Sequence, residues 1–155
     1  FGDAPIEGNR LQIKTQGTQM NSQMLFNTNT WYHIAFVCTG TKLYLYVNGI
    51  LDNSMDLPGT SMSINEFFIN DQSSYNKGDT RYSEFRFWNI ARTQNEILNN
   101  MYVCDPATPG FIFYYKMNEG SGNTLHDVSG GFGDIEIGGN GSPTWIQDVR
   151  IDGKN

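Results

Sequence analysis

The fold is decided by residues 31–49, which read WYHIAFVCTGTKLYLYVNG. In the first half, two sets of side chains alternate and both are largely apolar, so we expect a strand that is covered on both faces. In the second half, leucine or valine alternates with tyrosine over residues 43–47. The connection Thr39-Gly40-Thr41 places glycine where a positive φ is expected. The stretch therefore predicts a β-hairpin that ends at Asn48-Gly49.

Further short strands are expected at near-regular spacing along the chain. Clusters of Gly, Asn, Asp and Ser separate them, and these residues favour turns. The expected strands cover residues 11–14, 67–70, 82–89, 111–117, 135–137 and 144–151. Many short strands joined by turns indicate an all-β sandwich or barrel.

One segment interrupts the strand pattern and predicts a helix over about residues 93–102. It begins with Thr93-Gln94-Asn95-Glu96, the spacing that lets a threonine and a glutamate satisfy each other's backbone donors. Apolar residues then recur at helical spacing, and Pro106 and Pro109 prevent any continuation. We expect this helix to plug one open end of a sandwich.

Size and charge exclude several classes of protein. With 155 residues, the chain can bury one sizeable core, which predicts a single domain over residues 1–155. Its net charge of −6 comes without any cluster of Lys or Arg, so it would repel nucleic acid and anionic lipid. No run of about 18 apolar residues is present, so we expect no membrane insertion. Cys38 and Cys104 have neither the spacing of a zinc site nor the density of a disulfide scaffold, and buried thiols are expected.

Three phrases occur in an order and spacing that resemble the laminin-G-like jelly rolls of the concanavalin-A-like lectin/glucanase superfamily. Together they cover about residues 31–130. The phrases are the hairpin W-Y-H-I-A with L-Y-L-Y-V-N-G (31–49), the strand and helix E-F-R-F-W-N with E-I (84–97), and Y-K-M-N-E-G-S-G with D-V-S-G (115–130). The resemblance implies a two-sheet antiparallel jelly-roll sandwich with one short helix.

The resemblance also implies strands before the part that corresponds to Phe1-Gly2-Asp3-Ala4, and we expect these strands to be missing from this chain. The chain begins with Phe1, which suggests a processed or excised piece of a longer protein. The edge left open would favour strand exchange or assembly with another chain. Such domains suggest a secreted, periplasmic or cell-surface protein of the Bacteroidetes type.

Glycoside hydrolases share this architecture and use paired carboxylates. The best pair is Asp134 and Glu136, which as i and i+2 on one strand would lie about 7 Å apart. Glycines 138 and 139 follow where a further acidic residue would complete a hydrolase signature. Glu84 has Arg86 as its same-face neighbour, so we expect a solvated ion pair. The favoured prediction is that the chain is not an enzyme, with a hydrolase using Asp134 and Glu136 as the second alternative.

Calcium is the metal that oxygen-rich loops favour, and related jelly rolls often bind it. The first candidate ligand is Asp127, in a stretch that also offers Glu119 and Asn123. Asp3, beside a glycine, is the second. The alternative is that these residues only make Asx turns.

Sugars need flat apolar faces beside hydrogen-bonding groups, and the loop over residues 71–82 offers both. Its candidate contacts are Tyr75, Asn76, Asp79, Arg81 and Tyr82. The alternative is an ordinary polar loop. Trp31 is expected to fill the core or plug an end of the sandwich rather than to bind sugar. The sequence therefore predicts a non-catalytic carbohydrate-binding module, with a laminin-G-type domain that binds an extracellular protein as the first alternative.

Overall fold

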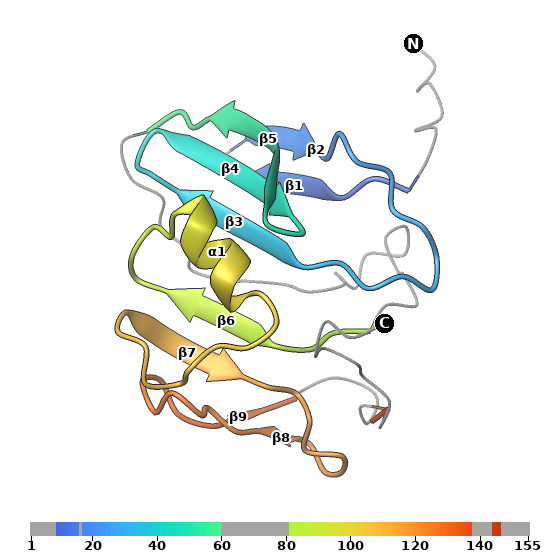
Figure 1. The fold of residues 1–155 in the computed structure, drawn as a ribbon, viewed down its shortest axis with the longest axis vertical. Coiled ribbons are helices and arrows are strands. Elements are labelled where there is room, and N and C mark those ends of the chain that lie inside the picture. The colour runs from blue at the N-terminus through green and yellow to red at the C-terminus, as the bar shows by residue number, and fades with distance from the viewer. Residues whose placement is uncertain (1–8, 16, 60–80, 138–143, 147–155) are drawn as a thin grey trace. The chain divides into compact units, whose positions relative to one another are not determined.

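The structure is a computed structural model that describes residues 9–15, 17–59, 81–137 and 144–146 (Figure 1). The chain divides into two compact units, residues 1–63 with 91–101 and residues 64–90 with 102–155. The described elements are antiparallel strands and one helix: β1 (Gln12–Thr15), β2 (Thr18–Asn21), β3 (Ile34–Cys38), β4 (Lys42–Val47), β5 (Ile50–Asp56), β6 (Phe85–Trp88), α1 (Gln94–Asn100), β7 (Phe111–Tyr115), β8 (Thr124–Leu125) and β9 (Ile135–Glu136). The prediction of an all-β fold with one short helix is confirmed.

The predicted hairpin forms the centre of the first unit. β3 pairs antiparallel with β4, and the turn between them places Gly40 at φ 82°. Asn48 (φ 51°) and Gly49 (φ 76°) both have left-handed backbone, as a tight turn between two strands requires. This turn does not end the sheet, because β5 follows at once and pairs with β4 in the order β3-β4-β5.

The core of the first unit lies on one face of this sheet. Leu45 is fully buried, and it packs with Met20 and Val47 against a ring of partly buried apolar side chains. The expectation that β3 is covered on both faces is wrong at Phe36, which pairs with Leu45 and is 42% exposed. Alternation identifies the residues that share a face, but it does not say what covers each of them.

The hairpin β1–β2 packs against β5 and delivers Met20 to that core. A side chain of β5 holds the end of β2, because Asn53 Nδ2 donates to the carbonyl of Asn21 at 2.9 Å. The carboxylate of Asp52 accepts from the backbone N–H groups of Gln23 (2.7 Å) and Met24 (2.8 Å). The start of the long connection between β2 and β3 is thereby tied to the sheet.

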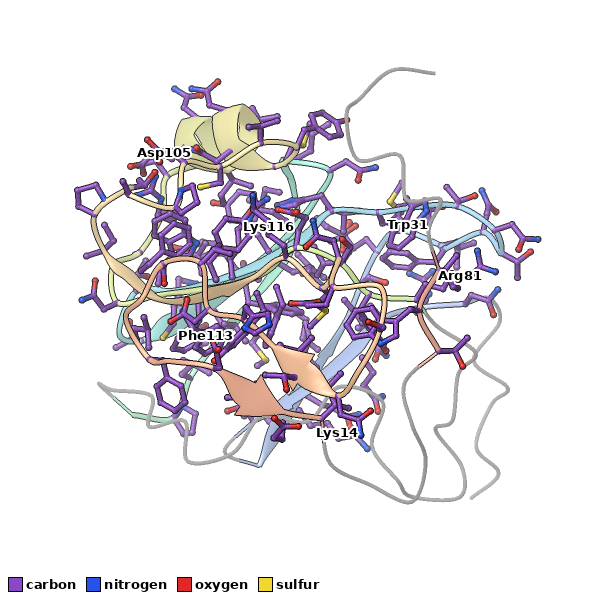
Figure 2. All side chains as sticks on the ribbon, turned by 90° about the horizontal axis from the view of Figure 1, so that it is seen from below. Lys14, Trp31, Arg81, Asp105, Phe113 and Lys116 are labelled. Atoms are coloured by element: carbon purple, nitrogen blue, oxygen red, sulfur yellow. The ribbon has the colours of Figure 1, made fainter. Side chains whose placement is uncertain are left out.

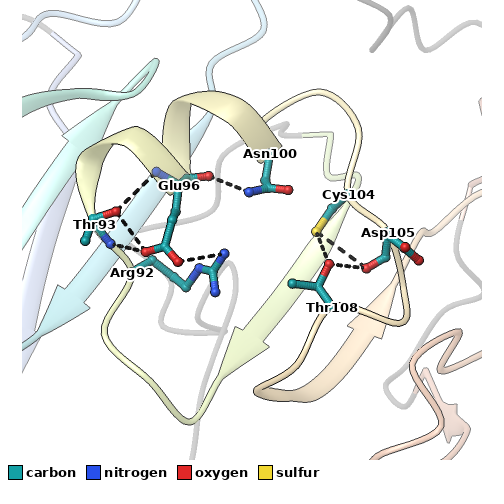
Figure 3. A network of polar contacts seen from close by, with 7 residues as sticks. All are labelled: Arg92, Thr93, Glu96, Asn100, Cys104, Asp105 and Thr108. Carbon is teal, nitrogen blue, oxygen red and sulfur yellow. Dashed lines mark hydrogen bonds and ion pairs between the residues drawn. The ribbon is translucent and has the colours of Figure 1, made fainter.

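The predicted capping box starts helix α1 (Figure 3). Thr93 Oγ1 accepts from the backbone N–H of Glu96 at 3.3 Å, and Glu96 Oε2 accepts from the N–H of Thr93 at 2.8 Å. The helix ends two residues earlier than expected, at Asn100, and Met101 is its C-cap. Ile97 is its buried residue, and Leu98 lies so close to Gly49 that a Cβ there would stand 2.3 Å from Leu98 Cδ2.

The second unit contains the pairs β6–β7 and β8–β9. Aromatic side chains fill both faces of β6–β7: Trp88 stacks on Phe111 at 3.6 Å, and Phe87 stacks on Phe113, labelled in Figure 2, at 5.4 Å. Tyr115 also makes a bridge to Asp127, which joins β7 to the segment after β8. Such stacked aromatic pairs add to the burial of apolar area.

Two of the expected strands lie wholly or partly outside the described residues. The strand expected over 67–70 lies outside them, as do residues 147–151 of the last expected strand. Residues 144–146 are described and are not in a strand; there Trp145 Nε1 donates to the carbonyl of Gly122 at 2.9 Å.

Both thiols are free, with Cys104 buried and Cys38 half-buried. The helix of the described segments is too short and too polar to cross a membrane.

Candidate functional site

The structure describes two of the five residues predicted to bind a glycan. Tyr75, Asn76 and Asp79 lie outside the described residues. Arg81 and Tyr82 are both exposed and directly precede β6 (Figure 2 labels Arg81). The backbone is held two residues after Tyr82, where the N–H of Glu84 donates to the carbonyl of Lys116 at 3.2 Å.

A buried polar cluster lies next to these two residues on β6–β7. The carboxylate of Glu84 accepts hydrogen bonds from the guanidinium of Arg86 and from the hydroxyl of Tyr114. The guanidinium of Arg86 also lies 4.9 Å from the centre of the Tyr114 ring. Burial, followed by the hydrogen bond to Glu84, raises the pKa of Tyr114 to about 12. The cluster therefore pairs its buried charges internally.

The expectation of a solvated Glu84–Arg86 pair is wrong. The pair forms, but the Arg86 side chain is only 8% exposed and the Glu84 side chain 17%. Glu84 also has a left-handed backbone (φ 59°), which costs free energy in a residue with a side chain. The i, i+2 spacing predicted the contact between Glu84 and Arg86. It could not predict that Tyr114 of β7 packs on the pair and that both side chains are largely buried.

Asp127 organises the turn between β8 and β9. Its Oδ1 accepts from the N–H groups of Tyr114 (2.9 Å) and Ser129 (3.0 Å) and from the Ser129 hydroxyl (2.6 Å). Its Oδ2 accepts from the N–H groups of Phe132 (2.8 Å) and Gly133 (3.1 Å). Burial alone would raise the pKa of Asp127, but the hydrogen bonds from Ser129 and the backbone outweigh it and hold this pKa well below its usual range.

Calcium binding by Asp127 stays a prediction, and Asp3 lies outside the described residues. The five donors around the Asp127 carboxylate occupy the positions from which it would reach a cation. Glu119 accepts from the N–H of His126 at 3.1 Å. Within residues 9–15, 17–59, 81–137 and 144–146, no group of three or more His, Cys, Asp or Glu side chains is arranged to hold a metal ion.

The two candidate catalytic carboxylates are exposed and each has its own partner. His126 Nδ1 lies 2.8 Å from Asp134 Oδ2, and the hydroxyl of Thr124 donates to Glu136 Oε1 at 2.6 Å. The hydrogen bond from His126 is the main reason that the pKa of Asp134 is lowered, and the same contact raises the pKa of His126. A general acid for glycoside hydrolysis needs a raised pKa instead. The environment of Asp134 opposes that role.

We expect Gly131→Ala to lower the free energy of unfolding by about 2–3 kcal/mol. A Cβ at this position would stand 2.5 Å from the carbonyl oxygen of Ile112, which belongs to the β7 backbone and cannot swing aside. The matched control is Gly130→Ala, where φ is +70° but no atom lies within 4 Å, so backbone strain of about 1 kcal/mol is expected alone. Urea unfolding measures both variants. Equal losses would show that the close approach of Gly131 to β7 does not affect the free energy of unfolding.

The expectation that Trp31 is a core or end-plug residue is wrong, because its side chain is 44% exposed. Its neighbour Tyr32 packs against the core instead. The uncharged polar run Asn27-Thr28-Asn29-Thr30 before Trp31 is a signal that could have indicated a surface position.

Comparison with known proteins supports the fold assignment. The sequence profile of the laminin G family of the concanavalin A-like lectin/glucanases superfamily matches residues 5–98. A solved structure from Bacteroides ovatus ATCC 8483, named as a candidate carbohydrate binding protein, is 27% identical with a TM-score of 0.67. The match covers 84% of this chain and 40% of that one.

An S-layer domain-containing protein from Clostridium thermocellum ATCC 27405 also matches, at 20% identity and a TM-score of 0.37, over 58% of this chain and 49% of that one. No curated protein matches the chain. The profile match extends over more than half of the chain and includes the hairpin and most of the helix. The chain therefore belongs to the laminin G family of the concanavalin A-like lectin/glucanases superfamily.

Proposed function

We propose that this chain is a non-catalytic carbohydrate-binding module of a secreted or cell-surface protein. The observation that carries the proposal is the match to the Bacteroides ovatus candidate carbohydrate binding protein over 84% of the chain at a TM-score of 0.67. The match covers 40% of that structure's chain. The residues proposed to contact the glycan are Tyr75, Asn76, Asp79, Arg81 and Tyr82.

The described part of this region suits binding. Exposed Arg81 and Tyr82 supply a charged donor and a flat ring, and the strand that follows them is held by the buried Glu84–Arg86–Tyr114 cluster. A fixed strand directly after exposed contact residues lowers the backbone conformational entropy lost on binding. Within the hydrolase alternative, the lowered pKa of Asp134 argues only against Asp134 as the general acid.

A glycan array probed with the whole chain tests the proposal, followed by calorimetry on each positive glycan. We expect binding without release of reducing sugar. Tyr82→Ala should weaken it at least about tenfold, whereas Tyr102→Ala, a second exposed tyrosine, should leave it unchanged. These two variants remove the same ring from different places on the surface.

Three results would contradict the proposal in different ways. Release of reducing sugar that is lost in Glu136→Gln would show a hydrolase. A folded chain that binds no glycan would favour the laminin-G-type protein-interaction alternative. Glycan binding that survives Tyr82→Ala would retain the function and move the contact residues elsewhere.

A further inference from the structure

A long stretch of this chain carries no formal charge. No Asp, Glu, Lys or Arg occurs between Lys14 and Lys42, although such residues make up 17% of the whole sequence. Asn, Gln, Thr and Ser supply most of its polar side chains. These groups both donate and accept hydrogen bonds without charge. The described side chains of this stretch can therefore hydrogen-bond a ligand without any charged group.

The end of this stretch combines such groups with an exposed aromatic ring. Asn27, Thr28, Asn29 and Thr30 are all exposed, and Trp31 follows them on the segment that leads into β3 (Figure 2). The other two tryptophans are engaged within the protein, by stacking on Phe111 or by donating to Gly122. Trp31 is thus an exposed aromatic residue that directly follows four exposed amide or hydroxyl side chains in the sequence, and we call residues 27–31 the Trp31 loop.

The residues that flank the Trp31 loop, Phe26 and Tyr32, pack against the core of the first unit. Tyr32 packs on the core of Met20, Leu45 and Val47, and its ring meets Phe26 edge to face at 4.7 Å. Its hydroxyl accepts from the N–H of Asn27 at 3.0 Å, which closes the loop on itself.

The residue after Tyr32 is fixed as well. The N–H of His33 donates to Asn48 Oδ1 at 2.9 Å, and the N–H of Asn48 donates to the carbonyl of His33 at 2.8 Å. Because the residues directly after Trp31 are held in this way, its backbone loses little conformational entropy when a ligand binds.

Two charged side chains that contact residues 22–24 are paired with backbone groups. Arg10 Nη1 donates to the carbonyls of Ser22 and Gln23, both at 2.6 Å. Asp52 accepts from the N–H groups of Gln23 and Met24. These bonds hold the residues before the Trp31 loop. An anionic sugar would need a cationic partner, and residues 17–41 of the described chain contain neither Lys nor Arg.

We propose that the Trp31 loop is a second glycan-binding surface, specific for neutral sugars, in which the indole stacks on the apolar face of a pyranose ring. The amide and hydroxyl groups of residues 27–30 would hydrogen-bond the sugar hydroxyls. This proposal rests on the proposed function, but it concerns different residues from the loop over 71–82. It also names the class of ligand, since the net charge of −6 and the uncharged loop both disfavour acidic glycans.

Native gels containing one soluble polysaccharide each, with the whole chain as the sample, test the proposal. The neutral probes are laminarin, galactomannan and xyloglucan, and the acidic probe is polygalacturonate. We expect retardation by at least one neutral probe, unchanged between about 50 and about 500 mM NaCl. Trp31→Ala should weaken this binding at least about tenfold, Trp31→Phe should keep part of it, and Phe132→Ala, which removes a ring that is 67% exposed elsewhere, should not change it.

Fluorescence gives a second readout that does not require the Trp31→Ala variant. Acrylamide quenches exposed indoles, and Trp31 is the exposed tryptophan of the described residues. Saturation with the bound neutral oligosaccharide should reduce quenching in the wild-type chain and change it little in Trp31→Phe. Equal protection in both would overturn the proposal even if Trp31→Ala fails to fold.

The remaining outcomes separate this proposal from the proposed function. Neutral binding lost in Tyr82→Ala but intact in Trp31→Ala would overturn the second surface and leave the module's function standing. Binding of polygalacturonate alone would overturn the neutral specificity. A chain that binds no glycan on the array or in any gel would overturn both proposals.

Discussion

Leu45→Ala is expected to lower the free energy of unfolding by about 3–5 kcal/mol. Leu45 is 0% exposed and lies at the centre of β4, between Met20 and Val47. Removal of its isobutyl group loses transfer free energy and leaves a cavity that the rigid sheet cannot fill. The effect is large because β3 and β5 flank the position on both sides and cannot close around it.

The matched control for this variant is Leu51→Ala. Leu51 is a leucine on the neighbouring strand β5 but is 47% exposed. We expect it to cost less than about 1 kcal/mol, since partial exposure halves the lost transfer free energy and leaves no closed cavity. Urea unfolding followed by circular dichroism measures both. A similar loss in the two variants would contradict the assignment of Leu45 to the core.

Asp127→Asn is expected to lower the free energy of unfolding by about 2–4 kcal/mol at neutral pH. The change keeps the shape of the side chain and replaces one accepting oxygen by an NH₂ group. That group would face the N–H donors of Phe132 and Gly133, or those of Tyr114 and Ser129. At least two backbone donors would lose their acceptor whichever orientation the amide takes.

The Asp127 effect should depend on pH in a defined direction. Because the folded state lowers the pKa of this carboxyl, the folded chain binds fewer protons there than the unfolded chain. The stabilisation is fully present above the unfolded pKa of about 3.9 and is lost as pH falls below it.

Unfolding at several pH values should therefore show the difference between wild type and Asp127→Asn shrinking in strong acid. Asp56→Asn is the control, because its ion pair with Lys42 is exposed to solvent and such pairs contribute little to stability. A difference that stays constant down to strong acid would exclude the carboxylate as the source of the effect.

Local patterns predicted the elements that have strong local signals. Strand β4 alternates leucine or valine with tyrosine, and its buried residues are the expected ones. Thr93 and Glu96 predicted the start of α1 through a motif that is complete within four residues. Its end was less predictable, because no glycine or basic residue marks it and Met101 has ordinary helical backbone.

Three strands were missed because their own sequences are weak signals. β2 reads TQMN and β8 is two residues long. β5 reads ILDNSMD, in which polar side chains replace the expected alternation. Their polar side chains instead bind other segments, as Asp52 and Asn53 do with the end of β2. Pairing with a neighbour, and not intrinsic preference, makes these residues strands.

The sequence by itself determined the hairpin, the helix start, the family and the residue types available for a site, because each depends on contacts within a short stretch. Only the tertiary structure decided that the Glu84–Arg86 pair is buried, that Asp127 has five donors, and that Trp31 lies outside the core while Tyr32 lies inside it. Exposure and hydrogen-bond partners depend on residues far away in the chain. A local pattern records which side chains share a face, and the packing of distant segments determines which face meets water.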